Sequence, residues 1–169
     1  IAVISDLHRG SDNDTDNFGA EKEEKFIKFL EASKRSHVDI IVRTGDINEL
    51  WQGDGWSESA RLKRVYQRYW RMELEARKYV IRSVYGNHDS SLKWVYPETI
   101  SLKSPYNGIN LAFMHGHQFD PQYRTSFSAW IGRVATEAWG IVEHIIGVKA
   151  ASYLLPEYDV IKQKQLVAR

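Results

Sequence analysis

The sequence contains no cysteine, no long apolar run and almost no net charge, and each absence excludes a class of protein. Without cysteine the chain forms no disulfide bond, and a metal that it binds has no thiolate ligand. No uninterrupted apolar run approaches the ~20 residues that a membrane-spanning helix needs. The formal net charge of +1 gives no overall reason to expect nucleic acid or an acidic partner.

The composition is that of an ordinary folded domain. Hydrophobic residues make up 43% of the chain and aromatic residues 12%, which is enough apolar material for a core. The 169 residues fit one domain, with an expected core over 1–120 and a helical insertion or cap over 121–169. No secretory signal is visible, so we expect a cytoplasmic protein, with peripheral contact to a membrane surface left open.

Polar side chains of metal-binding type follow four short apolar runs, each of which predicts a strand. Asp6 and His8 come after the first run, and residues two apart point the same way if extended geometry persists. In open α/β sheets, ligands bind beyond the carboxyl ends of the strands. One polynuclear metal site is therefore predicted from four clusters, namely Asp6-Leu7-His8, Gly45-Asp46, Gly86-Asn87-His88-Asp89 and His115-Gly116-His117.

Hydrophobic periodicity between these clusters predicts an α/β order of elements. Strands are expected over 1–5, 39–44, 79–85 and 109–114. Helices are expected over 20–35 and 57–78, the second with Ser57 as its N-cap, and a helical region near 125–150. Residues 92–103 are expected to be irregular or to form a short strand. The glycines at 45, 86 and 116 fit tight turns or a close approach of the backbone to bound ions.

The same clusters resemble the signature of the calcineurin-like metallophosphoesterases. The matching residues, in order, are Asp6-x-His8, Gly45-Asp46-x-x-Glu49, Gly86-Asn87-His88-Asp89 and His115. This resemblance implies an α/β fold in which two β-sheets form a sandwich flanked by helices. The segments 47–51 and 115–120 look most like the branch that contains the UDP-2,3-diacylglucosamine hydrolases.

The resemblance also implies a centre of two divalent metal ions. Asp6 and His8 would bind the first ion, Asn87 and His115 would bind the second, and Asp46 would bridge both. Carboxylate, amide and imidazole ligands suit manganese, which we expect first, and also iron, zinc or magnesium.

The implied reaction is hydrolysis of a phosphate ester or pyrophosphate bond. A hydroxide that bridges two ions about 3.5–4 Å apart would attack phosphorus in line with the leaving group. His88 would lie over the substrate phosphate as general acid or charge stabiliser, with Asp89 orienting it. The expected substrate is a phosphorylated small molecule or a nucleotide-linked compound.

Three further residues are expected to contact the substrate. Arg9 directly follows the Asp6–His8 pair, and arginine suits bidentate binding of phosphate. Asn48 lies just past Asp46, and His117 lies two residues after His115. The basic helix expected over 57–78 could gather an anionic substrate.

Three alternative functions stay open. A nuclease of the same superfamily would use the basic helix over 57–78 as a strand-binding face. A protein serine/threonine phosphatase would use the same metal core. The family pattern ends in a Gly-His-x-His block, and residues 116–119 offer only half of it. We therefore expect the domain to be incomplete at its C-terminus, and a catalytically inactive scaffold of the same fold is the third alternative.

Overall fold

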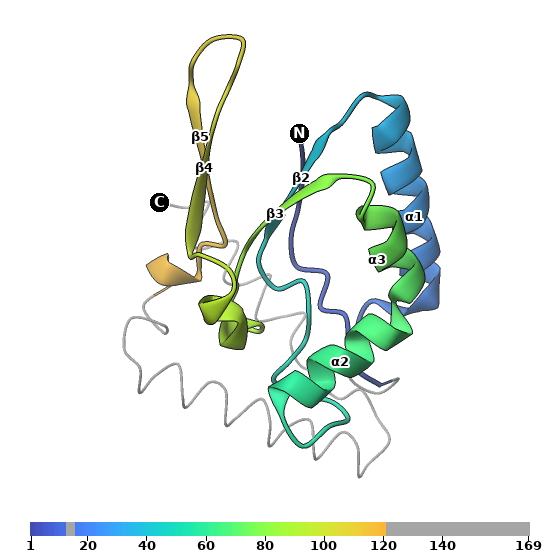
Figure 1. Cartoon of the computed structure of the whole chain (residues 1–169). Helices are drawn as coiled ribbons and strands as arrows, with labels where there is room; N and C mark the ends of the chain where they lie inside the picture. Colours follow the sequence, from blue (N-terminus) through green and yellow to red (C-terminus); the bar gives the residue numbers. More distant parts are fainter. Residues whose placement is uncertain (13–15, 121–169) are drawn as a thin grey trace, which may run out of the picture.

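The computed structural model of this chain describes residues 1–12 and 16–120 (Figure 1). This part holds two β-sheets together with α-helices, which confirms the α/β class expected from the sequence. The helical insertion expected near 125–150 and the cap over 121–169 lie outside the described residues.

Three short strands form a parallel sheet in the order β1–β2–β3. They are β1 (Ala2–Ile4), β2 (Ile40–Thr44) and β3 (Val80–Val84). Ile4 lies opposite Arg43, and Thr44 lies opposite Val84. Because the strands are parallel, their carboxyl ends share one edge, and the loops with the predicted metal ligands leave from that edge.

The helices α1 (Gly19–Arg35) and α3 (Trp70–Ala76) pack side by side next to this sheet (Figure 1). Phe26 and Leu30 are one turn apart on α1, so both point from the same helix face into the core. The residues of this core are Phe18, Phe26, Leu30, Ile41, Val65, Tyr69, Met72, Ala76 and Tyr79. The core therefore fastens the strands to the helices and leaves the strand ends free to form a site.

The expectation of a single helix over 57–78 is wrong, because two helices occupy this stretch. Helix α2 (Glu58–Arg68) begins at Ser57, whose hydroxyl accepts the N–H of Ala60 as expected for an N-cap. The backbone leaves the helical conformation at Tyr69, where ψ is 33°, and α3 follows directly. The buried Tyr69 side chain packs edge-on against Phe18, at 5.5 Å between ring centroids, so tertiary contacts position the kink.

A β-hairpin brings the last cluster to the site. Strands β4 (Thr99–Lys103) and β5 (Asn110–Met114) pair antiparallel and form the second sheet. The short helices η1 (Ser90–Trp94) and η2 (His117–Phe119) flank the hairpin in sequence. In the described ranges, no helix combines the length and the apolar composition that a bilayer crossing requires.

Candidate metal centre

Two loops run side by side beyond the ends of β1 and β2. The N–H of Asp6 donates to the carbonyl oxygen of Gly45 (3.2 Å), and that of His8 donates to Asp46 (3.0 Å). Asp6, His8 and Asp46 have φ values of 55°, 47° and 51°, in the left-handed region. Such a conformation costs on the order of 1–3 kcal/mol per residue and persists only where its surroundings enforce it. Extended geometry, the condition under which Asp6 and His8 were expected to point the same way, does not persist here, and a left-handed backbone brings the two side chains together instead.

The carboxylate of Asp46 lies between two imidazole rings that come from opposite sides of the site. Its Oδ2 atom is 3.8 Å from Nε2 of His8 and 3.2 Å from Nε2 of His115. Asp46 is only 3% exposed, whereas the side chain of Asp6 is 58% exposed and borders solvent. The buried carboxylate is therefore the group that the two halves of the site share.

The remaining predicted ligands complete this arrangement. Oδ1 of Asn87 is 3.1 Å from Nε2 of His115, and Oδ1 of Asp6 is 3.9 Å from Nε2 of His8. Two ligands that are each about 2.1 Å from one ion lie about 3.0–4.2 Å apart, depending on the angle between them. The separations around Asp46 fall in this interval, and the donor types suit a hard or borderline divalent ion.

The closest donor atoms divide into two triads that share Asp46. One triad is His8, Asp46 and His88, and the other is Asp6, Asp46 and His115. In each triad the candidate ligand atoms lie within 4.8 Å of one another. The structure thus brings the five predicted ligands together. Asp6 and His8 fall in different triads, although Oδ1 of Asp6 is 3.9 Å from Nε2 of His8, the pair that the resemblance assigned to the first ion.

His115 is oriented by the backbone of β2. Its Nδ1 atom lies 2.8 Å from the carbonyl oxygen of Thr44, so Nδ1 donates there and Nε2 faces Asp46 and Asn87. Burial lowers the pKa of His115, but the hydrogen bond and charge of Asp46 outweigh this and raise the pKa to about 9. Nε2 therefore faces the oxygen atoms of Asp46 and Asn87, at the position where a cation would lie.

Glu49 plays a part to which the sequence analysis gave no role. Its Oε2 atom lies 2.6 Å from Nδ1 of His88 and 3.4 Å from Nδ1 of His8, so both rings can donate to one carboxylate. Burial raises the pKa of Glu49, but the two histidines bring it down to about 2. This carboxylate keeps Nε2 of both rings available for a ligand. The only sequence signal for it was its place three residues after Asp46 in the matching block.

His88 is held between Trp51 and His8 at the edge of the site. Its ring stacks on Trp51 with 4.3 Å between centroids and 19° between planes. It meets His8 edge-on at 4.6 Å. The side chain of His88 is 21% exposed, so solvent and substrate can reach it.

The expectation that Asp89 orients His88 is wrong. The Asp89 carboxylate is 2% exposed and accepts backbone N–H groups of Gly86 (2.6 Å) and Ile47 (3.0 Å). Burial and the nearby charge of Asp46 raise the pKa of Asp89, while these hydrogen bonds lower it in part. Asp89 therefore fastens the loops after β2 and β3 to each other, and the imidazole of His88 is oriented by Glu49 instead.

Two of the expected substrate contacts are also wrong. Arg9 is 0% exposed and Asn48 is 3% exposed, and they hydrogen-bond each other (2.6 Å) inside the protein. The left-handed turn at His8 directs the next side chain inward, away from the donors. His117 lies near the site, with its ring centroid 5.5 Å from that of His115, and its contact with substrate stays a prediction.

Two glycines allow the loops to approach this closely. A Cβ atom on Gly45, where φ is 93°, would lie 2.7 Å from the ring of His115. A Cβ atom on Gly86 would lie 2.5 Å from the backbone nitrogen of Asp46 and still closer to its carboxylate. Both distances are below ordinary van der Waals contact, so side chains at these positions would displace the shared carboxylate or its partner.

The sequence profile of the calcineurin-like phosphoesterases matches residues 1–160 of the chain. No protein of curated function matches the chain.

Gly86→Ala should impair metal binding, because the added methyl group pushes against Asp46. We expect a loss of about 1–3 kcal/mol in the free energy of unfolding, typical of overpacking, together with weaker Mn²⁺ binding. Thermal unfolding and calorimetric Mn²⁺ titration measure the two effects. Ser91→Ala, an exposed position in η1, serves as the control. A Gly86→Ala protein that binds Mn²⁺ like the wild type contradicts this account of the site.

Metal binding should release protons at neutral pH. His115 has a pKa of about 9 without metal, so below that pH its ring must lose a proton before Nε2 can bind a cation. The apparent affinity for Mn²⁺ should therefore fall by about tenfold for each pH unit from pH 8 to pH 7. Titrations in two buffers of different ionisation enthalpy count the protons released, and an affinity that does not change with pH would refute the prediction.

Proposed function

The chain belongs to the calcineurin-like phosphoesterase family. On this basis we propose that it is a hydrolase that uses two divalent metal ions, and manganese is the metal that we expect first. The bond cleaved is a phosphate ester or pyrophosphate bond of a phosphorylated small molecule or a nucleotide-linked compound. The observation that carries this proposal is the position of Asp46, whose Oδ2 atom faces both His8 and His115.

The ions would be held by the carboxylates of Asp6 and Asp46, the imidazoles of His8 and His115, and the amide oxygen of Asn87. Bound ions supply Lewis acidity, which activates water and stabilises negative charge on a phosphoryl group. The protein contributes fixed positions, since the left-handed loops and the hydrogen bond from His115 to Thr44 set the donor atoms in place before an ion arrives.

His88 would give a proton to the oxygen atom of the leaving group. Its accessible ring, its bond to Glu49 and its stacking on Trp51 support this role. The Glu49 carboxylate accepts from Nδ1 and would stabilise the imidazolium, so Nε2 is the atom that carries the transferred proton.

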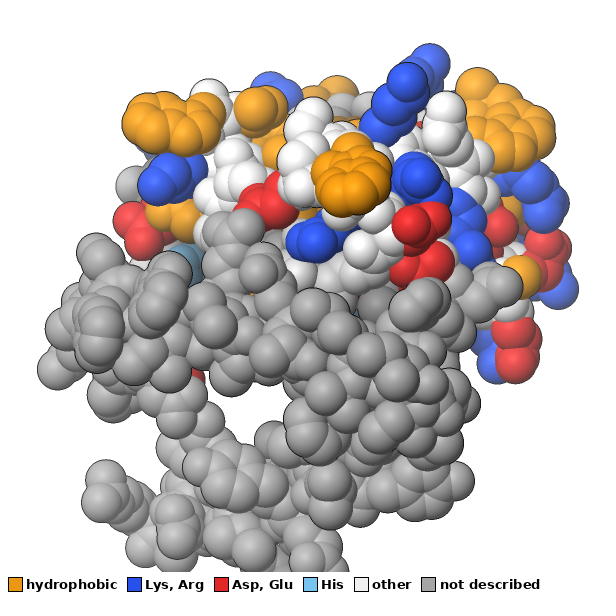
Figure 2. All heavy atoms as spheres, turned by 90° about the horizontal axis from the view of Figure 1, so that it is seen from below, with side chains coloured by type: hydrophobic (Ala, Val, Ile, Leu, Met, Phe, Trp, Pro, Cys, Tyr) orange, Lys and Arg blue, Asp and Glu red, His pale blue; other side chains and the backbone are white. Residues whose placement is uncertain are grey.

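The charge distribution favours a small substrate over a nucleic acid. Arginines of α2 and α3 pair with nearby acids, as in Arg64–Asp54 and Arg71–Glu24 (3.4 Å). Figure 2 shows basic and acidic side chains intermingled on the described part of the face viewed from below. A strand-binding face would need many unpaired cations along one surface.

Asp46→Asn should abolish most of the metal binding and turnover. The amide keeps the size of the side chain but loses the negative charge that two cations share, so we expect at least a hundredfold loss of activity. The assay compares a 4-nitrophenyl phosphomonoester, a bis(4-nitrophenyl) phosphodiester and a UDP-linked pyrophosphate, after chelation and after addition of Mn²⁺, Zn²⁺, Fe²⁺ or Mg²⁺. If chelated wild-type protein regains no hydrolysis of any probe with any ion, or Asp46→Asn keeps full turnover, the proposal fails.

His88 belongs to one donor triad, but we assign its ring to proton transfer and not to an ion. His88→Ala should therefore leave metal binding nearly unchanged and slow the reaction by roughly 10²–10⁴-fold on an alkyl phosphate. The loss should be much smaller for a 4-nitrophenyl ester, because nitrophenolate leaves without needing a proton. Turnover on the two substrates and calorimetric Mn²⁺ titration test this role. Equal losses on both substrates, or a large loss of metal affinity, would assign His88 to another task.

A further inference from the structure

Arg9 has a guanidinium group that solvent does not reach. Its side chain is 0% exposed. Arginine is almost never buried to this extent unless partners satisfy its charge and its N–H groups. One nitrogen donates to Oε1 of Glu73 (2.6 Å), and another donates to Oδ1 of Asn48 (2.6 Å). Nε donates to the carbonyl oxygen of Ile47 (3.4 Å). Arg9 therefore joins helix α3 to the loop that follows β2.

Glu73 is shared by two buried arginines. While Oε1 accepts from Arg9, Oε2 accepts from Nη2 of Arg43 on β2 (3.3 Å). Burial raises the pKa of Glu73, but the two guanidinium groups outweigh this and hold the pKa below its ordinary value. The carboxylate is thus ionised, and it connects α3 both to the sheet and to the loop after β1.

The backbone of Arg9 reinforces the same connection. Its N–H donates to Ile47 (3.2 Å), and its carbonyl oxygen accepts the N–H of Glu49 (3.0 Å). Buried ion pairs are weak contributors to stability, because apolar residues of similar volume often do as well. The Arg9–Glu73 pair instead fixes the position of the backbone next to His8 and the loop of Asp46. Both His8 and Asp46 have a left-handed backbone, which persists only where the surroundings enforce it.

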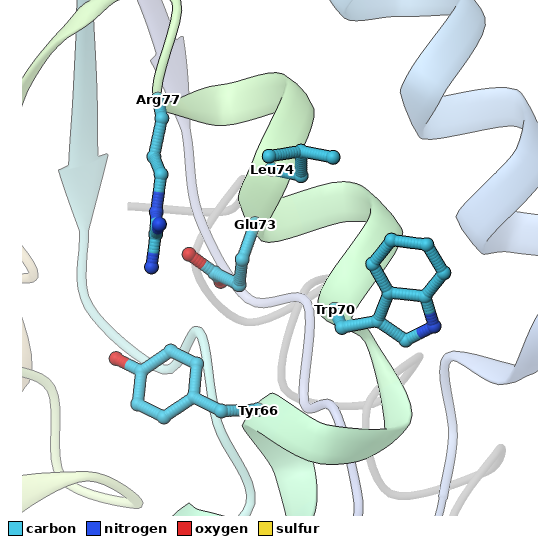
Figure 3. A pocket seen from close by; sticks show the side chains of 5 residues that line it. All are labelled: Tyr66, Trp70, Glu73, Leu74 and Arg77. Atoms are coloured by element: carbon cyan, nitrogen blue, oxygen red, sulfur yellow. The ribbon is translucent and has the colours of Figure 1, made fainter.

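Glu73 also forms part of the wall of a pocket along α2 and α3 (Figure 3). The hydroxyl of Tyr66, the carboxylate of Glu73 and the guanidinium of Arg77 extend to the same side of the helix (Figure 3). Trp70 and Leu74 complete the lining and are 59% and 54% exposed. The Glu73 side chain is itself 18% exposed, so a small anion in this pocket can reach the place of its carboxylate.

We propose that Glu73 is a positioning residue of the metal centre, which acts through Arg9 to hold the loops of His8 and Asp46 at the separation that metal binding requires. This inference rests on the proposed function. Glu73 bonds to no metal donor, and its contacts with the metal loops run through the buried guanidinium of Arg9, while Arg43 links it to β2.

The test compares Glu73→Gln with Glu75→Gln in calorimetric Mn²⁺ titrations. Glu75 lies on the same helix, its side chain has nearly the same exposure (19% against 18%), and its partner Lys78 does not reach the metal loops. Glu73→Gln keeps the size of the side chain but removes the charge, and we expect Mn²⁺ affinity to fall by about 10- to 100-fold. Glu75→Gln should stay within about twofold of the wild type. Equal affinities for both variants overturn the proposal.

Glu73→Ala adds a rescue experiment through the pocket. Formate can occupy the space left beside Arg9, so it should restore much of the lost Mn²⁺ affinity, whereas sodium chloride at the same ionic strength should not. Wild type and Glu75→Gln serve as controls for direct effects of formate on the ion. If formate restores folding, read by thermal unfolding, without restoring Mn²⁺ affinity, Glu73 serves stability alone and the proposal is overturned.

The two proposals fail in distinguishable ways. A wild-type chain that binds none of Mn²⁺, Zn²⁺, Fe²⁺ and Mg²⁺ contradicts the proposed function and ends both. A wild-type chain that binds Mn²⁺, together with a folded Glu73→Gln variant that binds it as tightly, contradicts only the role of Glu73.

Discussion

The structure around the strand ends depends on one buried carboxylate, that of Asp46. A buried anion is costly unless hydrogen bonds or cations surround it. Here its Oδ1 atom accepts the backbone N–H of His88 (2.9 Å), and Oδ2 faces the imidazoles of His8 and His115. Burial raises the pKa of Asp46, but the surrounding histidines outweigh it and lower the pKa. The close packing around this carboxylate also accounts for Gly86, because a Cβ atom at position 86 would collide with the Asp46 side chain.

Around this carboxylate, a second set of polar side chains holds the loops rather than reaching toward a substrate. Asp89 binds backbone N–H groups of two loops, Glu49 orients two imidazoles, and Glu73 anchors the guanidinium of Arg9. Each of these carboxylates is largely buried and satisfied by its neighbours. The rigidity of a metal site depends on such supporting contacts as much as on the ligands themselves.

The sequence predicted the elements of the core well and their local geometry less well. The strands β1, β2 and β3 and the helix α1 lie where apolar periodicity predicted them, because each has a face or residues buried in the core. The kink at Tyr69 carried no signal, since neither proline nor glycine marks it, and the Phe18 ring that packs on Tyr69 there is far away in the sequence. Likewise, proximity in sequence to His8 suggested that Arg9 meets the substrate, although the left-handed turn sends it into the interior.

By itself, the sequence determined which residue types stand at the ends of the strands, and therefore the chemistry that this edge of the sheet can support. Carboxylate, amide and imidazole groups after apolar runs predict divalent metal binding whatever the detailed path of the loops. Only the tertiary structure decided which donors lie close enough to share an ion and which polar residues support them. Those relations depend on distances between groups some 40 to 70 positions apart, such as the side chains of His8 and Glu49, or the ring of His115 and the backbone carbonyl of Thr44. Such distances are set by strand pairing and backbone conformation, which no local pattern encodes.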